Sequence, residues 1–309
     1  MYWYNWRICC ENLAAGGILC ERRAVAYEFM SCMPVEMSTR RRQVVQAPKA
    51  PFATKRQPHT KQEKSSRRKK AKTDDDAMAT SIVTIVTRHL RRAANPDRAP
   101  AMAKYMRDQF TFYGIGSPDL KSAFQDILAE SPAITQPADL RSTMLSLWRK
   151  PEREYQHIAL KFAERYRGLL LGKTADDCRE SARCLETLLT TRSWWDTIDS
   201  ISPNLVGYLA KEQPAVMNPV LEGWITHSNM WLRRTAILHQ LKYKHDTDQD
   251  KLFRFCLLCC HEKEFFIQKS IGWALRNHFR IAPQAVKDFV KENKDKLAPL
   301  SKREALKHA

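Results

Sequence analysis

The chain has 309 residues, with 52 Lys and Arg against 34 Asp and Glu and a formal net charge of +18. A positive charge of this size favours a polyanionic partner, because each basic group near a phosphate releases condensed counterions. Only 9 glycines occur, less than half of the usual share of ~7%, so folds that depend on glycine-rich phosphate loops are disfavoured; no apolar run reaches the roughly 18 residues that a membrane span needs.

Residues 1–78 are predicted to form a disordered N-terminal extension. Within it, residues 40–72 hold 13 Lys and Arg and a single acid, Glu63, and so carry a net charge of +12. Three prolines and few large apolar side chains leave too little apolar burial to offset the entropy lost on folding.

The densest basic stretch, residues 65–72, is typical of a nuclear localisation signal or of a non-specific nucleic-acid arm. A merely solvated tail is the alternative interpretation. We therefore expect a nuclear protein, with the mitochondrion and the cytoplasm left open.

Residues 79–309 are predicted to form one all-α domain. Apolar residues recur at spacings of three and four, as in Leu185, Leu188 and Leu189, and prolines fall near expected helix starts. No convincing series of alternating strands is present. About twelve to fourteen helices of roughly 10–18 residues fit the length.

A weak repeat indicates a more specific architecture. Trp195, Trp231 and Phe266 are 36 and 35 residues apart, each early in an amphipathic pattern, and Arg234 and Lys269 repeat the 35-residue offset. A period in the mid-thirties built of helix pairs is typical of an α-solenoid. The consensus residues of tetratricopeptide repeats are absent, so we predict a HEAT-like helical-repeat superhelix.

The short spacing of Cys256, Cys259, Cys260 and His261 is one that zinc sites also use. This cluster lies in an apolar helical run, however, and no second Cys pair is available to complete four ligands. We expect buried thiols on a helix face here and no metal site.

Three stretches combine tryptophan with charge. On a helix Trp195 and Asp199 are four residues apart and Trp273 and Arg276 are three apart, so each pair shares a face, and Arg234 follows a third tryptophan. An arginine-bearing face with interleaved aromatic rings suits a phosphate backbone and a base.

The carboxylate of Asp199 makes this pattern more specific, because bound phosphates repel it and its natural partner is a cation. An alkylated purine is such a cation, and the face of Trp195 attracts it. Loss of that base passes through an oxocarbenium-like sugar, which a carboxylate stabilises. The alternative is that Trp195 and Trp273 are core residues and that Asp199 caps a helix or forms a salt bridge.

Five motifs in order along residues 80–309 resemble the AlkD-type DNA alkylation repair glycosylases. Their sequences are YMRDQFTFYGI at 105–115, SWWDTID at 193–199, WLRRTAIL at 231–238, EFFIQKSIGWALR at 264–276 and LAPLSKREA at 297–305. The resemblance implies a HEAT-like superhelix whose concave, basic face grips duplex DNA. It also implies hydrolytic excision of positively charged N3- and N7-alkylated purines, without a metal or organic cofactor and with the lesion left stacked.

The resemblance further implies a role for each of six residues. Trp195 and Trp273 would flank the lesion, Asp199 would be the catalytic carboxylate, and Arg234 would bind the phosphate near the lesion. Arg276 would assist on the DNA and Tyr113 would line the cleft from the N-terminal side. The expected partner is double-stranded DNA that contains alkylated purines, the expected state is a monomer, and no membrane is involved.

Two other classes remain open. The first is a non-catalytic HEAT-like protein that binds unusual DNA structures, and the second is a protein-binding scaffold. The position of Asp199 between Trp195 and Arg234 favours the enzyme over the first. A steep salt dependence of DNA binding would disfavour the second.

Overall fold

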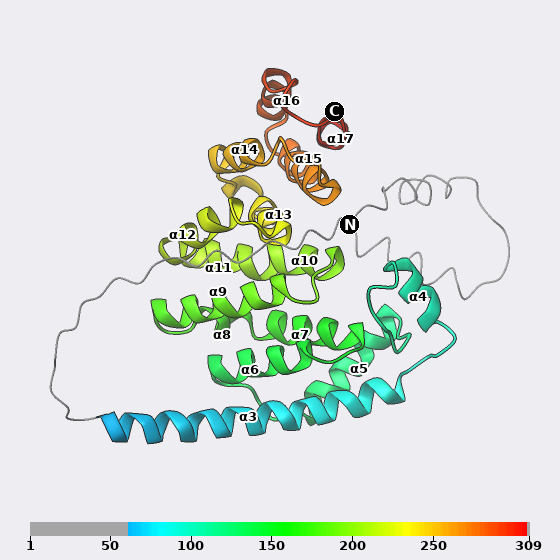
Figure 1. Cartoon of the computed structure of the whole chain (residues 1–309), viewed down its shortest axis with the longest axis vertical. Helices are drawn as coiled ribbons and strands as arrows, with labels where there is room; N and C mark the ends of the chain where they lie inside the picture. The colour runs from blue at the N-terminus through cyan, green and yellow to red at the C-terminus, as the bar shows by residue number, and fades with distance from the viewer. Residues whose placement is uncertain (1–60, 308–309) are drawn as a thin grey trace, which may run out of the picture. The chain divides into compact units, whose positions relative to one another are not determined.

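Helices follow one another along the whole described chain, which in this computed structural model is residues 61–307, with side chains from residue 77 (Figure 1). The α-helices are α3 (Lys61–Arg92), α4 (Ala99–Tyr105), α5 (Ser117–Glu130), α6 (Pro137–Trp148), α7 (Arg153–Arg165), α8 (Arg167–Leu171), α9 (Ala175–Thr190), α10 (Trp195–Ile201), α11 (Gly207–Glu212), α12 (Pro214–Ile225), α13 (Met230–Leu238), α14 (Gln249–Leu258), α15 (Phe265–Phe279), α16 (Pro283–Glu292) and α17 (Pro299–Ala305). Within these residues the β-structure amounts to one isolated bridge between Thr111 and Glu152. The prediction of an all-helical fold is confirmed.

Helix α3 crosses the boundary that the sequence predicts after Met78. It begins at Lys61 in a stretch rich in Lys, Glu, Gln, Arg and Ala, residues with high helix propensity, and no proline interrupts it before its end at Arg92. Residues 1–60, with most of the predicted extension and the first part of the basic segment 40–72, lie outside the described residues. None of the described helices is both long enough and apolar enough to cross a membrane.

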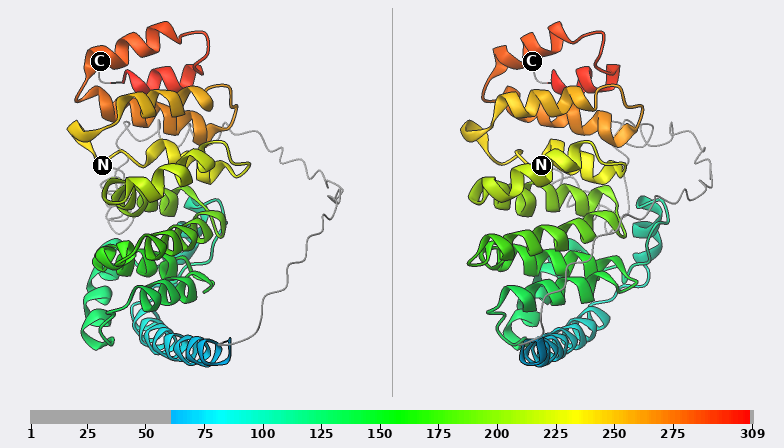
Figure 2. Two further views of the ribbon diagram at one scale, coloured as in Figure 1. Left: turned by 90° about the vertical axis from the view of Figure 1, so that its left-hand side faces the viewer. Right: turned by 60° about the vertical axis from the view of Figure 1, so that its left-hand side comes forward.

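Residues 70–309 form one unit in which helices are stacked tier upon tier (Figures 1 and 2). Helices α7, α10, α13, α15 and α17 contact one another in that order and form one row, which we call the α7 row. Helices α6, α9 and α12 contact each other in the same order and pack against members of that row. This stacking of helix pairs confirms the HEAT-like repeat architecture.

In the middle of the α7 row the repeat length is constant, without a deviation of even one residue. Helices α10, α13 and α15 begin at equal intervals of 35 residues, at Trp195, Met230 and Phe265. By these helix starts the counterpart of Trp231 and Phe266 on α10 is Asp196, one position after Trp195, so the predicted alignment of Trp195 with Trp231 is off by one residue. Trp194 is the ring that packs with Trp231 and Phe266, at centroid distances of 6.0 and 5.4 Å.

Several helices are shorter than the predicted 10–18 residues, and local chemistry explains the breaks. Helix α8 has 5 residues and ends at Gly172, whose φ of 65° turns the chain toward α9. Helix α10 has 7 residues and is followed by a π-helical turn, Ser202–Val206. Pro203 has no N–H to donate to the carbonyl of Asp199 four residues earlier, so the regular α-helical pattern is interrupted there.

The cysteine prediction is confirmed for the first two thiols of the cluster. Cys256 and Cys259 are buried and free, and Cys260 is half-buried just beyond the end of α14. Burial raises the pKa of the Cys259 thiol to about 12, which keeps it protonated. Among residues 77–307, no group of three or more His, Cys, Asp or Glu is placed to hold a metal ion.

Candidate functional site

Asp199 and Arg234 form a bidentate salt bridge between α10 and α13. Arg234 Nε lies 2.9 Å from Asp199 Oδ1, and Arg234 Nη2 lies 2.9 Å from Oδ2. Only 13% of the Asp199 side chain and 5% of the Arg234 side chain are exposed. Two parallel N–H···O bonds fix the carboxylate in one orientation more firmly than a single bond does.

The environment of Asp199 disfavours its charge. Burial raises the pKa of its carboxyl group, Arg234 opposes this by charge and hydrogen bonding, and the nearby Asp196 raises the pKa further. The net direction is upward, so Asp199 becomes protonated at a higher pH than an ordinary aspartate. The ion pair with Arg234 is the described interaction that favours the carboxylate form.

Aromatic rings hold Arg234 in place from the other side. Its Nη1 donates a hydrogen bond to the carbonyl of Phe266, and its guanidinium lies 5.8 Å from the centroid of that ring. Phe266 packs in turn on Trp231, with ring centroids 5.0 Å apart, and on Trp194. The sequence pattern marked Trp231 and Phe266 as repeat positions; the structure shows that they form the support of the arginine.

Trp195 is the first residue of α10, and its partner is Tyr105 at the end of α4. The two rings meet edge to face with centroids 6.0 Å apart. Tyr105 is 42% exposed, a high value for a large aromatic side chain, so this pair presents an open aromatic surface. Sequence reasoning missed Tyr105, although it is the first residue of a motif that carries the family resemblance.

Tyr113 is half-buried and is held by hydrogen bonds to two other segments. Its hydroxyl is 3.2 Å from the hydroxyl of Tyr155, which donates to Thr87, and its backbone N–H donates to Glu154. Glu154 also accepts hydrogen bonds from the two residues after Tyr113, so this segment is anchored to the start of α7. The role of Tyr113 in the cleft stays a prediction.

Trp273 and Arg276 lie one turn apart on α15, as predicted. Trp273 is half-buried and packs against the core. Arg276 Nη1 is 2.6 Å from Glu304 Oε2 on α17, and Lys269 Nζ is 3.0 Å from Glu304 Oε1. Burial alone would raise the pKa of Glu304, but Lys269 and Arg276 together lower it.

Four of these charges form a ladder along the α7 row. Asp199 on α10 is followed after 35 residues by Arg234 on α13. Two further steps of the same length reach Lys269 on α15 and Glu304 on α17. The first two residues pair with each other and so do the last two, so the cations Arg234 and Lys269 are the two middle members of the ladder, on the contacting helices α13 and α15.

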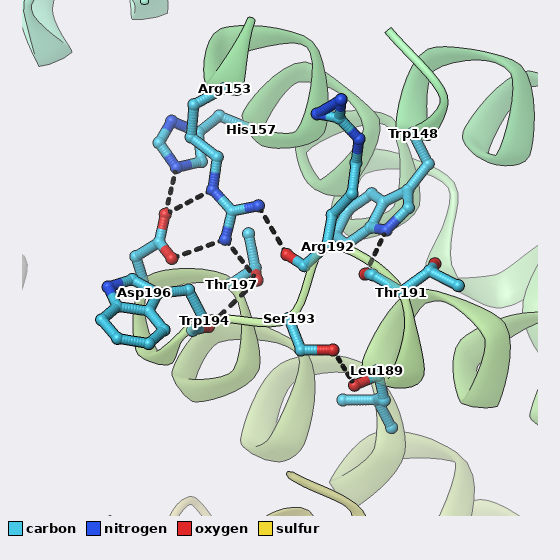
Figure 3. Close-up of polar contacts among 10 residues, drawn as sticks. All are labelled: Trp148, Arg153, His157, Leu189, Thr191, Arg192, Ser193, Trp194, Asp196 and Thr197. Carbon is cyan, nitrogen blue, oxygen red and sulfur yellow. Dashed lines mark hydrogen bonds and ion pairs between the residues drawn. The ribbon is translucent and has the colours of Figure 1, made fainter. Parts of the chain in front are cut away.

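A second buried ion pair lies at the start of α10 (Figure 3). Arg153 binds both carboxylate oxygens of Asp196, at 2.9 and 2.6 Å, and His157 Nε2 is 3.0 Å from Asp196 Oδ2. Burial alone would raise the pKa of Asp196, but the charges and hydrogen bonds of Arg153 and His157 hold it well below its usual range. Nothing in the sequence pattern singled out Arg153 or Asp196.

The fold and the site define a class: a helical-repeat protein with a charged, tryptophan-lined site on successive helices of one row. Comparison with known proteins gives the family. The model of the family described as DNA alkylation repair enzyme matches residues 86–309, and the chain belongs to this family.

One solved structure shows how far the likeness extends. It is described as a predicted DNA alkylation repair enzyme from Enterococcus faecalis and is 29% identical to this chain, with a TM-score of 0.60. The alignment covers 70% of this chain and 96% of the other. A comparison with curated proteins gave no match.

Proposed function

We propose that the protein is a DNA glycosylase that hydrolyses the N-glycosidic bond of cationic N3- or N7-alkylated purines in duplex DNA. The observation that carries the proposal is the position of Asp199. Its carboxylate is held by both N–H arms of Arg234, and it is on the same helix as Trp195, four residues further on. A carboxylate beside an aromatic face and an arginine suits a substrate that joins a cationic base to a phosphate backbone.

The reaction follows from the charge of the lesion. As the bond between C1′ and the purine nitrogen breaks, its electron pair goes to the purine and cancels the positive charge of the base. Positive charge then develops on the sugar, where the carboxylate of Asp199 stabilises it. A water oxygen bonds to C1′ and releases one proton to solvent, so the products are a neutral alkylpurine and an abasic sugar.

Arg234 has two parts in this scheme. It orients Asp199, and it brings a cation to the place where the phosphate next to the lesion must lie. Trp195 and Trp273 are proposed to flank the lesion nucleotide and Arg276 to assist on the backbone. Arg276 would then share its charge between Glu304 and the DNA.

The test is excision of N7-methylguanine from methylated duplex DNA by wild type and Asp199→Asn. The amide keeps the size of the side chain and removes its charge, so we expect excision to fall by about 10²–10³-fold while DNA binding is retained. Asp246→Asn is the matched control, because Asp246 pairs with Lys211 at an exposed position. Equal turnover by wild type and Asp199→Asn would exclude the catalytic role.

A second function is favoured by one observation. The salt bridge between Asp199 and Arg234 is closed and largely buried, as in a purely structural ion pair. A non-catalytic DNA-binding protein of the same fold would use it only for stability. In that case wild type would release no base from methylated DNA, yet would bind duplex DNA with a steep dependence on salt.

Nuclear location is part of the proposal and depends on residues 65–72. Replacement of the basic residues between Arg67 and Lys72 by Ala is expected to leave the protein in the cytoplasm. Fluorescence microscopy of tagged wild type and variant measures this. Retention of the variant in the nucleus would exclude the signal.

A further inference from the structure

Arg153 is the first residue of α7, and its side chain is fully buried. Its guanidinium forms hydrogen bonds with one short segment, residues 192–197 (Figure 3). Besides its two bonds to Asp196, it donates to the hydroxyl of Thr197 at 2.9 Å and to the carbonyl of Arg192 at 2.9 Å. Four N–H···O bonds thus reach the turn before α10 and its first residues. His157 also contacts this segment, with Nε2 3.0 Å from Asp196 Oδ2.

A second segment, residues 110–111, also contacts Arg153. The ring of Phe110 stacks on the guanidinium, with its centroid 3.8 Å from Cζ, and the backbone N–H of Arg153 donates to the carbonyl of Thr111. Phe110 follows Tyr105 by one short turn of chain. Arg153 therefore contacts both segments whose aromatic rings, Tyr105 and Trp195, meet at the candidate site.

The arrangement is better suited to placing groups than to stabilising the fold. Burying an arginine and a carboxylate costs several kcal/mol of desolvation, and apolar packing commonly stabilises a core equally well. A planar guanidinium, however, sets the position and the angle of each partner that it bonds. Asp199 is three residues after Asp196, so a shift at the start of α10 moves the carboxylate of Asp199 with it.

The charge of Arg153 also affects Asp199, through Asp196. Asp196 is an anion one turn from Asp199; it faces the cation Arg153 and the imidazole of His157, both from α7. Asp199 itself faces Arg234 from α13 and Asp196 on its own helix. Without Arg153, the negative charge of Asp196 would act on Asp199 with less compensation and make its carboxylate form harder to keep.

We propose that Arg153 is a positioning residue of the alkylpurine site: it sets the start of α10 against the segment that carries Tyr105, and it neutralises Asp196 beside Asp199. The inference rests on the proposed function. It assigns to a fully buried residue an effect on lesion excision that its contribution to stability does not account for.

The experiment compares Arg153→Lys with Arg233→Lys in the full chain. Arg233 is a matched control because it also makes a bidentate pair, with Glu262, and also donates to two backbone carbonyls, those of His227 and Ser228. Both variants are characterised first by thermal unfolding. Excision of N7-methylguanine and binding of undamaged duplex are then measured for each.

We expect Arg153→Lys to lower excision by about 10–100-fold, since small misplacements of catalytic groups have effects of this size. Arg233→Lys is expected to stay within about twofold of wild type at a comparable loss of stability. Affinity for undamaged duplex should be unchanged in both. Equal losses of excision in the two variants would overturn the positioning role.

A binding measurement separates this inference from the proposed function. Duplex with a cationic pyrrolidine abasic analogue imitates the charged sugar, and duplex with neutral tetrahydrofuran does not. In wild type the preference for the cationic analogue should fall as Asp199 is protonated. In Arg153→Lys the midpoint of that fall should move to higher pH, because a lysine cannot hold both oxygens of Asp196 as Arg153 does. In Thr197→Val, which keeps both of those bonds and loosens only the start of α10, a smaller move in the same direction is expected.

The outcomes distinguish a failure of the proposed function from a failure of the positioning role of Arg153. If wild type prefers the cationic analogue but excises no lesion, the proposed function fails while the positioning role is still measured by the shift of the midpoint. If Arg153→Lys does not fold, Thr197→Val carries the comparison, because it removes one bond to Arg153 and the bond that the hydroxyl donates to the Trp194 carbonyl, and leaves Arg153 in place. Midpoints that coincide with that of wild type would refute the inference.

Discussion

Lys269 and Glu304 repeat the relationship of Asp199 and Arg234 with the order of charges reversed. Each pair joins successive helices of the α7 row across 35 residues, and in each pair the salt bridge is short and mostly buried. Arg234 and Lys269 hold equivalent positions on the contacting helices α13 and α15, and each pairs with an anion on the helix on its other side, α10 or α17.

The two parallel hydrogen bonds from Arg234 to Asp199 are expected to matter more for excision than the positive charge of Arg234. Arg234→Lys keeps the cation but loses one of the two bonds to Asp199, so we expect excision of N7-methylguanine to fall by about 10–100-fold. The control is Arg254→Lys, since Arg254 makes a similar two-bond pair with Glu222 at an exposed position. That variant should change stability by no more than about 0.5 kcal/mol. Equal excision by Arg234→Lys and wild type would contradict the prediction.

The two tyrosines of the N-terminal motif should differ in effect. Tyr105→Ala removes the ring that meets Trp195, so we expect excision to fall by about fivefold, in line with an aromatic contact of ~1 kcal/mol. Tyr113→Phe removes only the hydroxyl bonded to Tyr155 and should leave excision within about twofold of wild type. Initial rates at saturating enzyme measure both. A larger loss of excision in Tyr113→Phe than in Tyr105→Ala would contradict this order and support the predicted role of Tyr113 in the cleft.

Excision should depend on pH through Asp199. Burial raises the pKa of this carboxyl group, and the reaction uses its ionised form. Activity is therefore present above the raised pKa and is lost as the pH falls through it, at a pH above the value of about 4 of an ordinary aspartate. Single-turnover rates on a stable cationic lesion, measured from pH 4 to 8, give the midpoint. A profile with its acid limb at or below pH 4 would contradict the upward shift.

Gly272 permits α17 to approach α15, the helix that carries Trp273. A Cβ at Gly272 would lie 2.5 Å from the Cβ of Glu304 and 2.9 Å from the carbonyl oxygen of Ser301. We expect Gly272→Ala to destabilise the protein by about 1–3 kcal/mol, as overpacking does. In Gly223→Ala the new Cβ meets nothing within 4 Å, so helix propensity should make that variant about 0.5–1 kcal/mol more stable. Denaturant unfolding measures the free energy of unfolding of both variants. If Gly272→Ala leaves that free energy unchanged, α17 moves away from α15 without cost and the prediction is contradicted.

Much of the fold was predictable because its determinants are local. Apolar spacings of three and four, prolines at helix starts and a 35-residue offset all act within one helix or between neighbouring repeats. The same is true of the pairs that share a helix face, such as Trp195 with Asp199 and Trp273 with Arg276. The repeat also related Arg234 to Lys269, which the structure places at equivalent positions on α13 and α15.

Contacts between distant segments were not predictable from these patterns. The sequence pattern did not single out Tyr105, whose ring meets Trp195 only in the folded chain, 90 residues away along the sequence. Two adjacent tryptophans were available as well, and it is Trp194 that joins the aromatic support of Arg234. Arg153 gave no signal at all, because its role depends on two segments that meet only in the folded protein.

The sequence by itself therefore determined an all-helical repeat protein and the residue types of its site. Periodicity and propensity act over one or two turns of helix, and those distances are readable along a chain. Only the tertiary structure decided which charges pair and which rings touch. Salt bridges such as Asp199 with Arg234 need atoms within about 3 Å, and helix packing alone brings residues 35 positions apart to that distance.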